Sequence, residues 1–249
     1  KQDVQAFLKK LNEIQIRKLF DDLKEKYGQD LFGQGWLYRI ISKNEIADVE
    51  KLTEKEKLNG ITRKKTFVPY DKGDKDGNRW YAPTPYYIDW SEENVKFLKE
   101  NSGKKGEGMP VVRNPQFYFR EGFCWTDVNS TYLKARIKEN GVYDVLTMSL
   151  FTCTKLPDWY FVCHINSKFI SEYVDDFVNS TSHFQINDAR QLPIIIPTPE
   201  QLKQFEDIFN RAYAVQKNKF DNKISETEAE EKLEVIQKEL DALVEKMYI

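Results

Sequence analysis

Residues 117–151 have the sequence FYFREGFCWTDVNSTYLKARIKENGVYDVLTMSLF, which contains a strict alternation of side-chain types. Apolar or small residues at positions 131, 133, 135 and 137 alternate with Tyr132, Lys134, Arg136 and Lys138, and Asn140-Gly141 follows. A period of two predicts a half-buried strand, and Asn-Gly predicts a tight hairpin because both central residues of that turn need a positive φ. The segment therefore predicts a hairpin whose first strand has one apolar face.

The opposite face of this predicted strand is a row of cations. An aromatic segment with Arg120 and Trp125 leads into it. A sheet face that carries lysine and arginine is a surface that can meet a polyanion. Lys134 and Arg136 would lie about 7 Å apart along the strand, close to the phosphate repeat of one nucleic-acid strand. We predict that both contact phosphates.

Charge is unevenly distributed along the chain. The 249 residues, 40% of them hydrophobic, can bury a sizeable core, and the formal net charge of −2 does not by itself indicate nucleic acid. Residues 63–138, however, carry 15 basic and 10 acidic side chains (15 − 10 = +5), whereas residues 139–249 carry 11 and 19 (11 − 19 = −8). The asymmetry indicates that the central segment binds an anion and the C-terminal segment does not.

Cysteine usage and hydropathy favour a reducing, cytoplasmic environment. The three cysteines, at positions 124, 153 and 163, form no CxxC pair, and their odd number argues against a disulfide framework. Cys153, Cys163, His164 and His183 fit no zinc-site spacing, so we expect no metal and interpret the thiols as buried apolar groups. The sequence contains no apolar run of membrane-spanning length and no signal peptide. Because the chain begins with Lys1 rather than Met, we expect it to be a fragment or processed form of a longer protein.

The first part of the chain contains helix and strand signals. Apolar residues at near-helical spacing over 2–27 predict a helix that ends at Gly28, and a turn and strand are expected from residue 31. The capping box Thr53-x-x-Glu56 predicts a short helix over about 54–58. The segment 63–90 predicts two aromatic-rich strands joined by a tight exposed turn. A helix is expected from Ser91 to about Glu100, followed by a loop over 103–108.

The second part contains further signals. Residues 159–165 are apolar enough to predict a buried strand, with Asn166 as the cap of a helix over about 167–178. Residues 192–197 predict a short edge strand bounded by prolines. Thr198, with Pro199 and Gln201, predicts a helix start, and Ser225 with Glu228 predicts another. Apolar residues at steps of four and three favour an antiparallel helical hairpin.

These elements together predict an α+β fold: a mixed, mainly antiparallel sheet core, flanking helices and a C-terminal antiparallel helical hairpin. The order of several segments resembles the C-terminal specificity (target recognition) region of type IIG and TaqI-like restriction-modification DNA adenine methyltransferases, and of the methylase component of phage-exclusion systems. The segments that carry the resemblance are Lys65-Thr66-Phe67-Val68-Pro69-Tyr70, Arg79-Trp80-Tyr81, Ile88-Asp89-Trp90, Phe119-Arg120-Glu121-Gly122-Phe123-Cys124-Trp125, Asn166-Ser167-Lys168, Phe184-Gln185-Ile186, Leu192-Pro193-Ile194 and 240–248.

The resemblance implies a domain organisation and a function. Residues 1–30 would be an N-terminal helix or a linker from an upstream domain, 31–197 a DNA target recognition domain, and 198–249 a helical spacer. Such a module recognises a short double-stranded DNA sequence while a methyltransferase domain of the same polypeptide flips out an adenine. The chain itself would then have no catalytic residue and no cofactor, and the parent protein, bacterial and cytoplasmic, would use S-adenosylmethionine, with or without an endonuclease. The hairpin would brace the module against the methylase or a helical packing partner.

Two alternatives stay open. Asn114-Pro115-Gln116-Phe117 is similar to the Asn-Pro-Pro-aromatic motif of adenine methylases, and Phe32-Gly33-Gln34-Gly35 is similar to their Gly-rich cofactor turn. The second proline is missing, however, and a polar segment precedes Gly33 where a hydrophobic strand is needed. In the other alternative, the chain is a protein-interaction module that uses the helical hairpin and does not bind DNA.

Candidate DNA contacts follow from side-chain chemistry. Recognition of a base requires planar, bidentate donors or amides, which favours arginines for guanine, and Gln116 or Asn78 for adenine. Lysines in or beside loops can follow a groove edge. Trp80, Tyr81 and Trp125 are expected in the core, since burying a large side chain contributes about 2–3 kcal/mol. The predicted DNA-binding residues are Lys64, Lys65, Arg79, Lys104, Lys105, Arg113, Arg120, Lys134 and Arg136.

Overall fold

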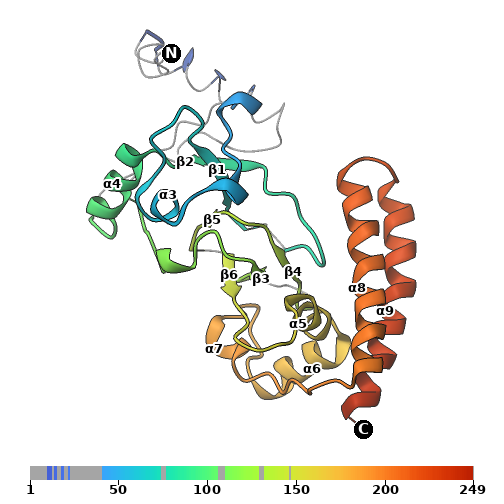
Figure 1. Ribbon diagram of the computed structural model, residues 1–249. Helices are drawn as coiled ribbons and strands as arrows, with labels where there is room; N and C mark the ends of the chain where they lie inside the picture. The colour runs from blue at the N-terminus through green and yellow to red at the C-terminus, as the bar shows by residue number, and fades with distance from the viewer. Residues whose placement is uncertain are drawn as a thin grey trace.

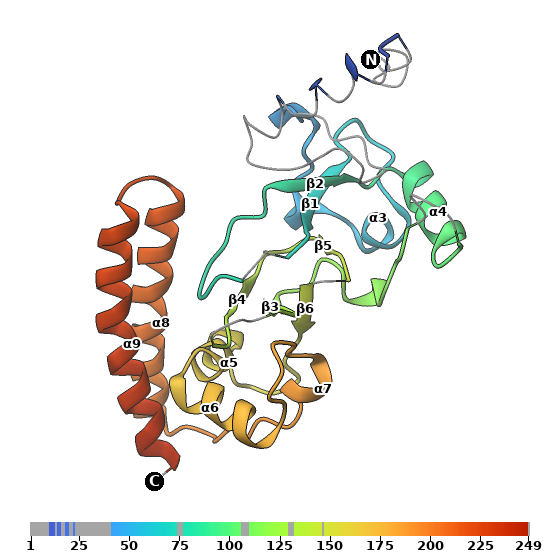
Figure 2. The ribbon, with the colours of Figure 1, turned by 180° about the vertical axis from the view of Figure 1, so that it is seen from behind.

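The computed structural model describes residues 41–73, 77–105, 110–128, 132–145 and 147–248, with a few separate positions between 10 and 22. It has two small, mostly antiparallel sheets, flanking helices and a pair of long C-terminal helices (Figures 1 and 2). The predicted α+β class is confirmed. The helix predicted over 2–27 falls mostly outside the described residues, and so does the strand expected from residue 31.

The first sheet has the strand order β2-β1-β5. Strand β1 (Phe67–Asp71) pairs antiparallel with β2 (Tyr86–Asp89) and parallel with the short β5 (Val142–Tyr143). Helix α3 (Glu54–Asn59) and helix α4 (Glu92–Asn101) flank it.

Both of these helices begin as predicted. The Thr53 hydroxyl accepts from the Glu56 N–H and Ser91 accepts from Asn94, which satisfies donors that the first helical turn leaves unpaired. Trp90 anchors α3 by donating its indole N–H to the carbonyls of Glu56 and Lys57.

The second sheet has the order β4-β3-β6, with every pair antiparallel. Its central strand β3 (Gly122–Thr126) is buried throughout between β4 (Ala135–Lys138) and β6 (Thr147–Leu150). Helices α5 (Asp158–Ile165), α6 (Lys168–Phe177) and α7 (Ile186–Ala189) lie below this sheet in Figure 1. The core formed here includes Trp80 and Trp125, as predicted for both aromatics.

The hairpin predicted at Asn140-Gly141 is wrong. Strands β4 and β5 on either side of it belong to different sheets, so the short segment between them is a crossing and not a turn. Gly141 passes against Pro69 so closely that a Cβ would lie 2.6 Å from the Pro69 carbonyl oxygen. The preference of Asn-Gly for a hairpin turn is overridden here, because β4 pairs with the buried strand β3 and β5 pairs with the edge of β1.

Two further strand predictions are wrong. Residues 159–165, predicted as a strand, lie in helix α5, most of whose residues are buried; periodicity alone cannot distinguish a short buried strand from a buried helix. Residues 192–197 join no sheet, because Pro193 and Pro197 lack the N–H donors that a ladder needs. Carbonyls of this segment accept instead from tyrosine hydroxyls: Tyr160 donates to Ile195 at 2.6 Å and Tyr248 to Pro193. Helix α6 starts near the predicted position, with Ser167 as its cap.

The predicted C-terminal hairpin is confirmed. Helix α8 (Pro199–Phe220) begins with the Thr198 capping box, and α9 (Glu226–Tyr248) runs back beside it. Phe205 of α8 and Leu240 of α9 are fully buried in the core that also holds α5. The turn of the hairpin lies far from α6 in both views (Figures 1 and 2).

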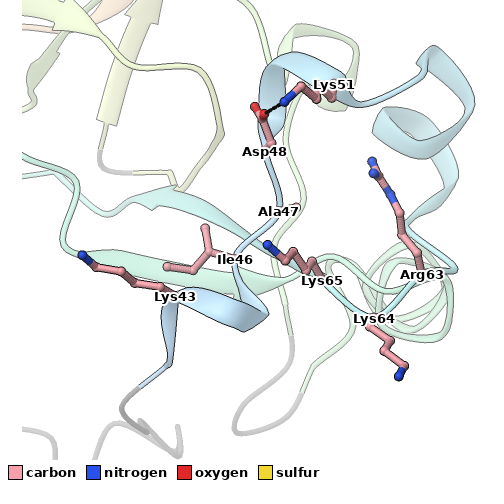
Figure 3. A pocket seen from close by; sticks show the side chains of 8 residues that line it. All are labelled: Lys43, Ile46, Ala47, Asp48, Lys51, Arg63, Lys64 and Lys65. Carbon is pink, nitrogen blue, oxygen red and sulfur yellow. Dashed lines mark ion pairs between the residues drawn. The ribbon is translucent and has the colours of Figure 1, made fainter.

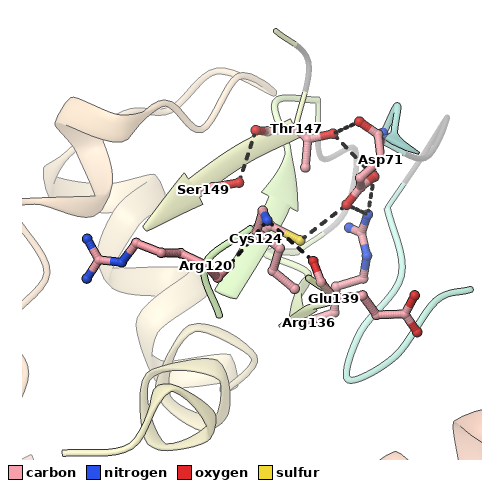
Figure 4. A network of polar contacts seen from close by, with 9 residues as sticks. Asp71, Arg120, Cys124, Arg136, Glu139, Thr147 and Ser149 are labelled. Atoms are coloured by element: carbon pink, nitrogen blue, oxygen red, sulfur yellow. Dashed lines mark hydrogen bonds and ion pairs between the residues drawn. The ribbon is translucent and has the colours of Figure 1, made fainter. Parts of the chain in front are cut away.

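A buried ion pair joins the two sheets. Arg136 on β4 donates to both carboxylate oxygens of Asp71 on β1, at 3.1 and 3.0 Å, and Thr147 on β6 also donates to Asp71 (Figure 4). The Arg136 side chain is only 4% exposed. Nearby, Trp80 extends the edge of β4 by donating to the Ala135 carbonyl at 2.9 Å.

Replacing Arg136 with Met should lower the free energy of unfolding by about 3–5 kcal/mol, because it leaves the Asp71 carboxylate buried without its cation. Urea unfolding of purified protein measures the change. The matched control is Arg211→Met, which removes two exposed ion pairs, with Asp207 on α8 and Glu239 on α9, and should cost about 1 kcal/mol or less. Equal losses in the two variants would contradict a stabilising role for the pair between the sheets.

Stability should also fall in acid because of His164. Burial lowers the pKa of His164 from its ordinary 6.5 to about 4, so the unfolded chain binds a proton in this range and the folded chain does not. Above pH 6.5 His164 is neutral in both the folded and the unfolded chain and does not lower the free energy of unfolding. As the pH falls from 6.5 toward 4, protonation of His164 in the unfolded chain lowers the free energy of unfolding by about 3 kcal/mol in all. Unfolding free energies measured from pH 7 to pH 4 should fall less steeply in His164→Leu. Val162→Ala, a buried change that removes no titratable group, should keep the wild-type slope.

Candidate functional site

A hollow of about 520 Å³ on the first sheet is lined mostly by cations (Figure 3). We call it the cationic pocket. Its eight lining residues include a single carboxylate, that of Asp48, and two apolar side chains, those of Ile46 and Ala47. The five others are Lys43, Lys51, Arg63, Lys64 and Lys65.

Three short segments deliver these cations. Lys43 lies on the 3-10 turn η1 (Lys43–Glu45), Lys51 on η2 (Val49–Lys51), and the remaining three on the connection from α3 to β1. The Ala47 N–H donates to the Phe67 carbonyl at 2.8 Å, which holds the η1–η2 segment along the start of β1. Residues 20 or more positions apart are thus brought to one rim.

The electrostatics of the cationic pocket favour an anionic ligand. Lys51 pairs with Asp48 at 2.7 Å, and this hydrogen-bonded pair raises the pKa of Lys51. Arg63 pairs with Glu56 at 2.9 Å. Lys43, Lys64 and Lys65 are exposed and form no ion pair with any residue that the structure describes. Three ammonium groups without an ion-pair partner among the described residues, on the rim of one hollow, favour phosphate or carboxylate oxygens there.

Two of the predicted DNA-binding residues, Lys64 and Lys65, belong to this pocket. Lys104 and Lys105 are exposed beyond the end of α4, Arg113 is exposed in the following segment, and Arg120 is exposed before β3. The structure therefore does not bring all the predicted residues to one place. Their role in binding DNA stays a prediction.

Arg79 lies elsewhere, in a second hollow of about 670 Å³ beside α6 and α9. Its guanidinium lies 3.6 Å over the centre of the Tyr132 ring and donates to Oε1 of Gln237 at 2.7 Å. Burial lowers the pKa of Arg79 to about 10. These contacts hold the Arg79 guanidinium against side chains of the protein itself. Asn78, considered for adenine, accepts from Gln216 of α8 at 3.5 Å.

The exposed row of cations predicted on the strand at 131–138 is wrong. Lys134, Arg136 and Lys138 are 8%, 3% and 2% exposed. The period of two is present, but Asp71 and Tyr143 of the first sheet meet the face that was expected to be solvated, the first at Arg136 and the second at Lys138. Lys138 donates to the carbonyls of Arg120 and Glu139, and burial lowers its pKa.

The Asn114–Phe117 motif forms an exposed turn. Asn114 adopts a left-handed conformation (φ 50°) and caps the 3-10 turn η3 (Pro115–Phe117). Gly33 and Gly35, its predicted partners in a methylase site, lie outside the described residues. The methylase alternative therefore stays open. Among the described residues, no three His, Cys, Asp or Glu side chains are grouped to hold a metal ion.

The thiols only partly follow the sequence prediction. Cys124 and Cys163 are buried, as expected for apolar groups, whereas Cys153 is exposed.

Sequence reasoning missed Lys43, Lys51 and Arg63. Arg63 could have been found from the sequence, because it directly precedes the predicted Lys64 and Lys65. Lys43 and Lys51 have no comparable signal, because their place in the pocket depends on a bridge between Ile46 and Phe67, which are 21 positions apart (67 − 46).

Comparison with known proteins gives one informative similarity. The chain is 24% identical over 154 residues to "Adenine-specific methyltransferase BrxX" of Escherichia coli O9:H4 (strain HS). The matched region covers 61% of this chain and 12% of that protein, so the chain corresponds to a small part of its relative. No protein-family profile matches. None of the described helices is long and apolar enough to cross a membrane.

Proposed function

We propose that this chain is the double-stranded DNA recognition module of an adenine-specific methyltransferase, acting in the bacterial cytoplasm. The module positions the target while a catalytic domain of the same polypeptide, with bound S-adenosylmethionine, methylates the adenine N6. Two observations support the proposal: the similarity to part of an adenine-specific methyltransferase and the cationic pocket. The pocket carries the argument, because it is a feature of this chain itself.

The cationic pocket suits the DNA backbone. Duplex DNA carries a negative charge about every 1.7 Å along its axis, and lysines that neutralise phosphates release condensed counterions. Five cations against one carboxylate give this surface a local excess that the whole chain, with its net charge of −2, does not have. Contacts of this kind fix register without selecting bases, so they supply binding and orientation.

Replacing Lys43, Lys64 and Lys65 together with Ala should weaken binding to any duplex and lower the slope of log K against log salt by about 3, one for each lost phosphate contact. Fluorescence anisotropy of a labelled duplex, measured from about 50 to 200 mM salt, gives both quantities. The matched control is Lys203, Lys232 and Lys246 replaced with Ala, which removes the same charge from the exposed surface of α8 and α9.

The control triple should keep the wild-type slope within about 1. Equal effects of the two triples would show that net charge alone governs binding. An absence of wild-type binding at 50 mM salt would sink the proposed function.

Replacing Asp48 with Asn should strengthen DNA binding about 2- to 5-fold, because the change removes the single lining carboxylate and releases Lys51 from its ion pair. The same anisotropy titration measures it. Asp207→Asn, which disrupts an exposed ion pair with Arg211 on α8, is the matched control and should leave the affinity unchanged. A weaker complex with Asp48→Asn would show that Asp48 positions Lys51 for the ligand instead of competing with it.

A further inference from the structure

Arg120 lies beside a stacked pair of aromatic side chains at the surface. The rings of Phe117 and Phe151 stack with centroids 5.0 Å apart and planes 9° from parallel. The Arg120 guanidinium carbon lies 5.5 Å from the first centroid and 5.3 Å from the second. Figure 4 shows the side chain pointing away from the polar network around Asp71. Cation–π contacts at these distances restrict where the guanidinium lies.

The backbone is arranged to present this residue. Phe119 has a left-handed conformation (φ 59°), which is costly for a bulky residue, and it is buried in the core of the first sheet. Its N–H donates to the Gly141 carbonyl at 2.9 Å, and Lys138 donates to the Arg120 carbonyl at 3.4 Å. At this bend the Phe119 side chain lies in the core and the Arg120 side chain lies at the surface, with the backbone of both held by these hydrogen bonds.

The guanidinium has no hydrogen-bond or ion-pair partner among the described residues. Asp158, at the start of α5, is close enough for Arg120 to oppose the rise in its pKa that burial causes, but the two form no ion pair. An exposed arginine whose position is restricted by aromatic rings, and whose donors have no partner among the described residues, is arranged for an external acceptor. Of the other candidates, Arg79 contacts Tyr132 and Gln237 of the protein itself, and the Arg113 guanidinium forms no cation–π contact with any described residue.

We propose that Arg120 recognises guanine in the major groove of the target DNA. The planar fork of an arginine donates to O6 and N7 of guanine together, the geometry that a lysine cannot reproduce. The contacts with Phe117 and Phe151 reduce the side-chain freedom that binding would otherwise remove. This inference rests on the proposed function and adds the base that the module selects, whereas the cationic pocket holds phosphates.

The test uses the whole chain and a library of random duplexes. Duplexes bound by wild type are selected and sequenced, and the affinity for the preferred duplex is compared with that for duplexes in which one guanine is replaced. Arg120→Lys should reduce the preference for guanine at one position by about 10- to 100-fold and leave the affinity for a scrambled duplex nearly unchanged. Phe117→Leu with Phe151→Leu should give a smaller loss at the same position.

Arg211→Lys, the same substitution on α8, is the control and should leave the preference intact. A uniform loss for all duplexes in Arg120→Lys, with a salt slope lowered by about 1, would show a phosphate contact and overturn the inference. So would an unchanged preference, or a wild-type protein that binds every duplex equally. In these cases DNA binding itself is still observed, so the proposed function survives; only a wild type that binds no duplex removes both.

Discussion

The Asp71–Arg136 ion pair is the contact through which the two halves of the structure are held in one arrangement. It joins β1 of the first sheet to β4 of the second, and Thr147 of β6 bonds to the same carboxylate. A buried pair is costly to desolvate, and in some proteins such groups select one arrangement over others. The pairing of Trp80 with β4 and of β5 with β1 adds to the same junction. The cationic pocket and Arg120 are therefore displayed from a common frame.

The cations of the central segment divide between two roles because of this junction. Lys134, Arg136 and Lys138 are buried within it, where they bond to carbonyls, a carboxylate and aromatic rings. Lys64, Lys65 and Arg120 stay exposed on irregular segments; the first two line the pocket and the third lies beside the stacked rings of Phe117 and Phe151. Alternation along a strand indicates which residues share a face. It does not indicate whether solvent or another sheet meets that face.

The sequence predicted the elements whose signals are local. The caps at Thr53, Ser91 and Thr198 worked because each hydroxyl satisfies an N–H three residues away, whatever the rest of the chain does. The hairpin prediction at Asn140-Gly141 was wrong because β4 and β5, the strands on either side, pair with strands distant in the sequence and not with each other. The same division applies to the site: the Arg63-Lys64-Lys65 run is visible in the sequence, whereas the contribution of Lys43 exists only once Ile46 meets Phe67.

The short connection at Asn140-Gly141 also bears on which parts of this chain can change in sequence without disturbing the fold. Only residues 139–141 separate β4 from β5, so a short connection joins the two sheets at this point. The longer connections, between β1 and β2 and between α4 and β3, contain the buried Trp80 and Phe119 but also exposed positions such as Pro83 and Val111. Surface connections tolerate changes in length and sequence far better than the elements they join. Substitutions at these exposed positions should therefore leave the arrangement of the two sheets intact.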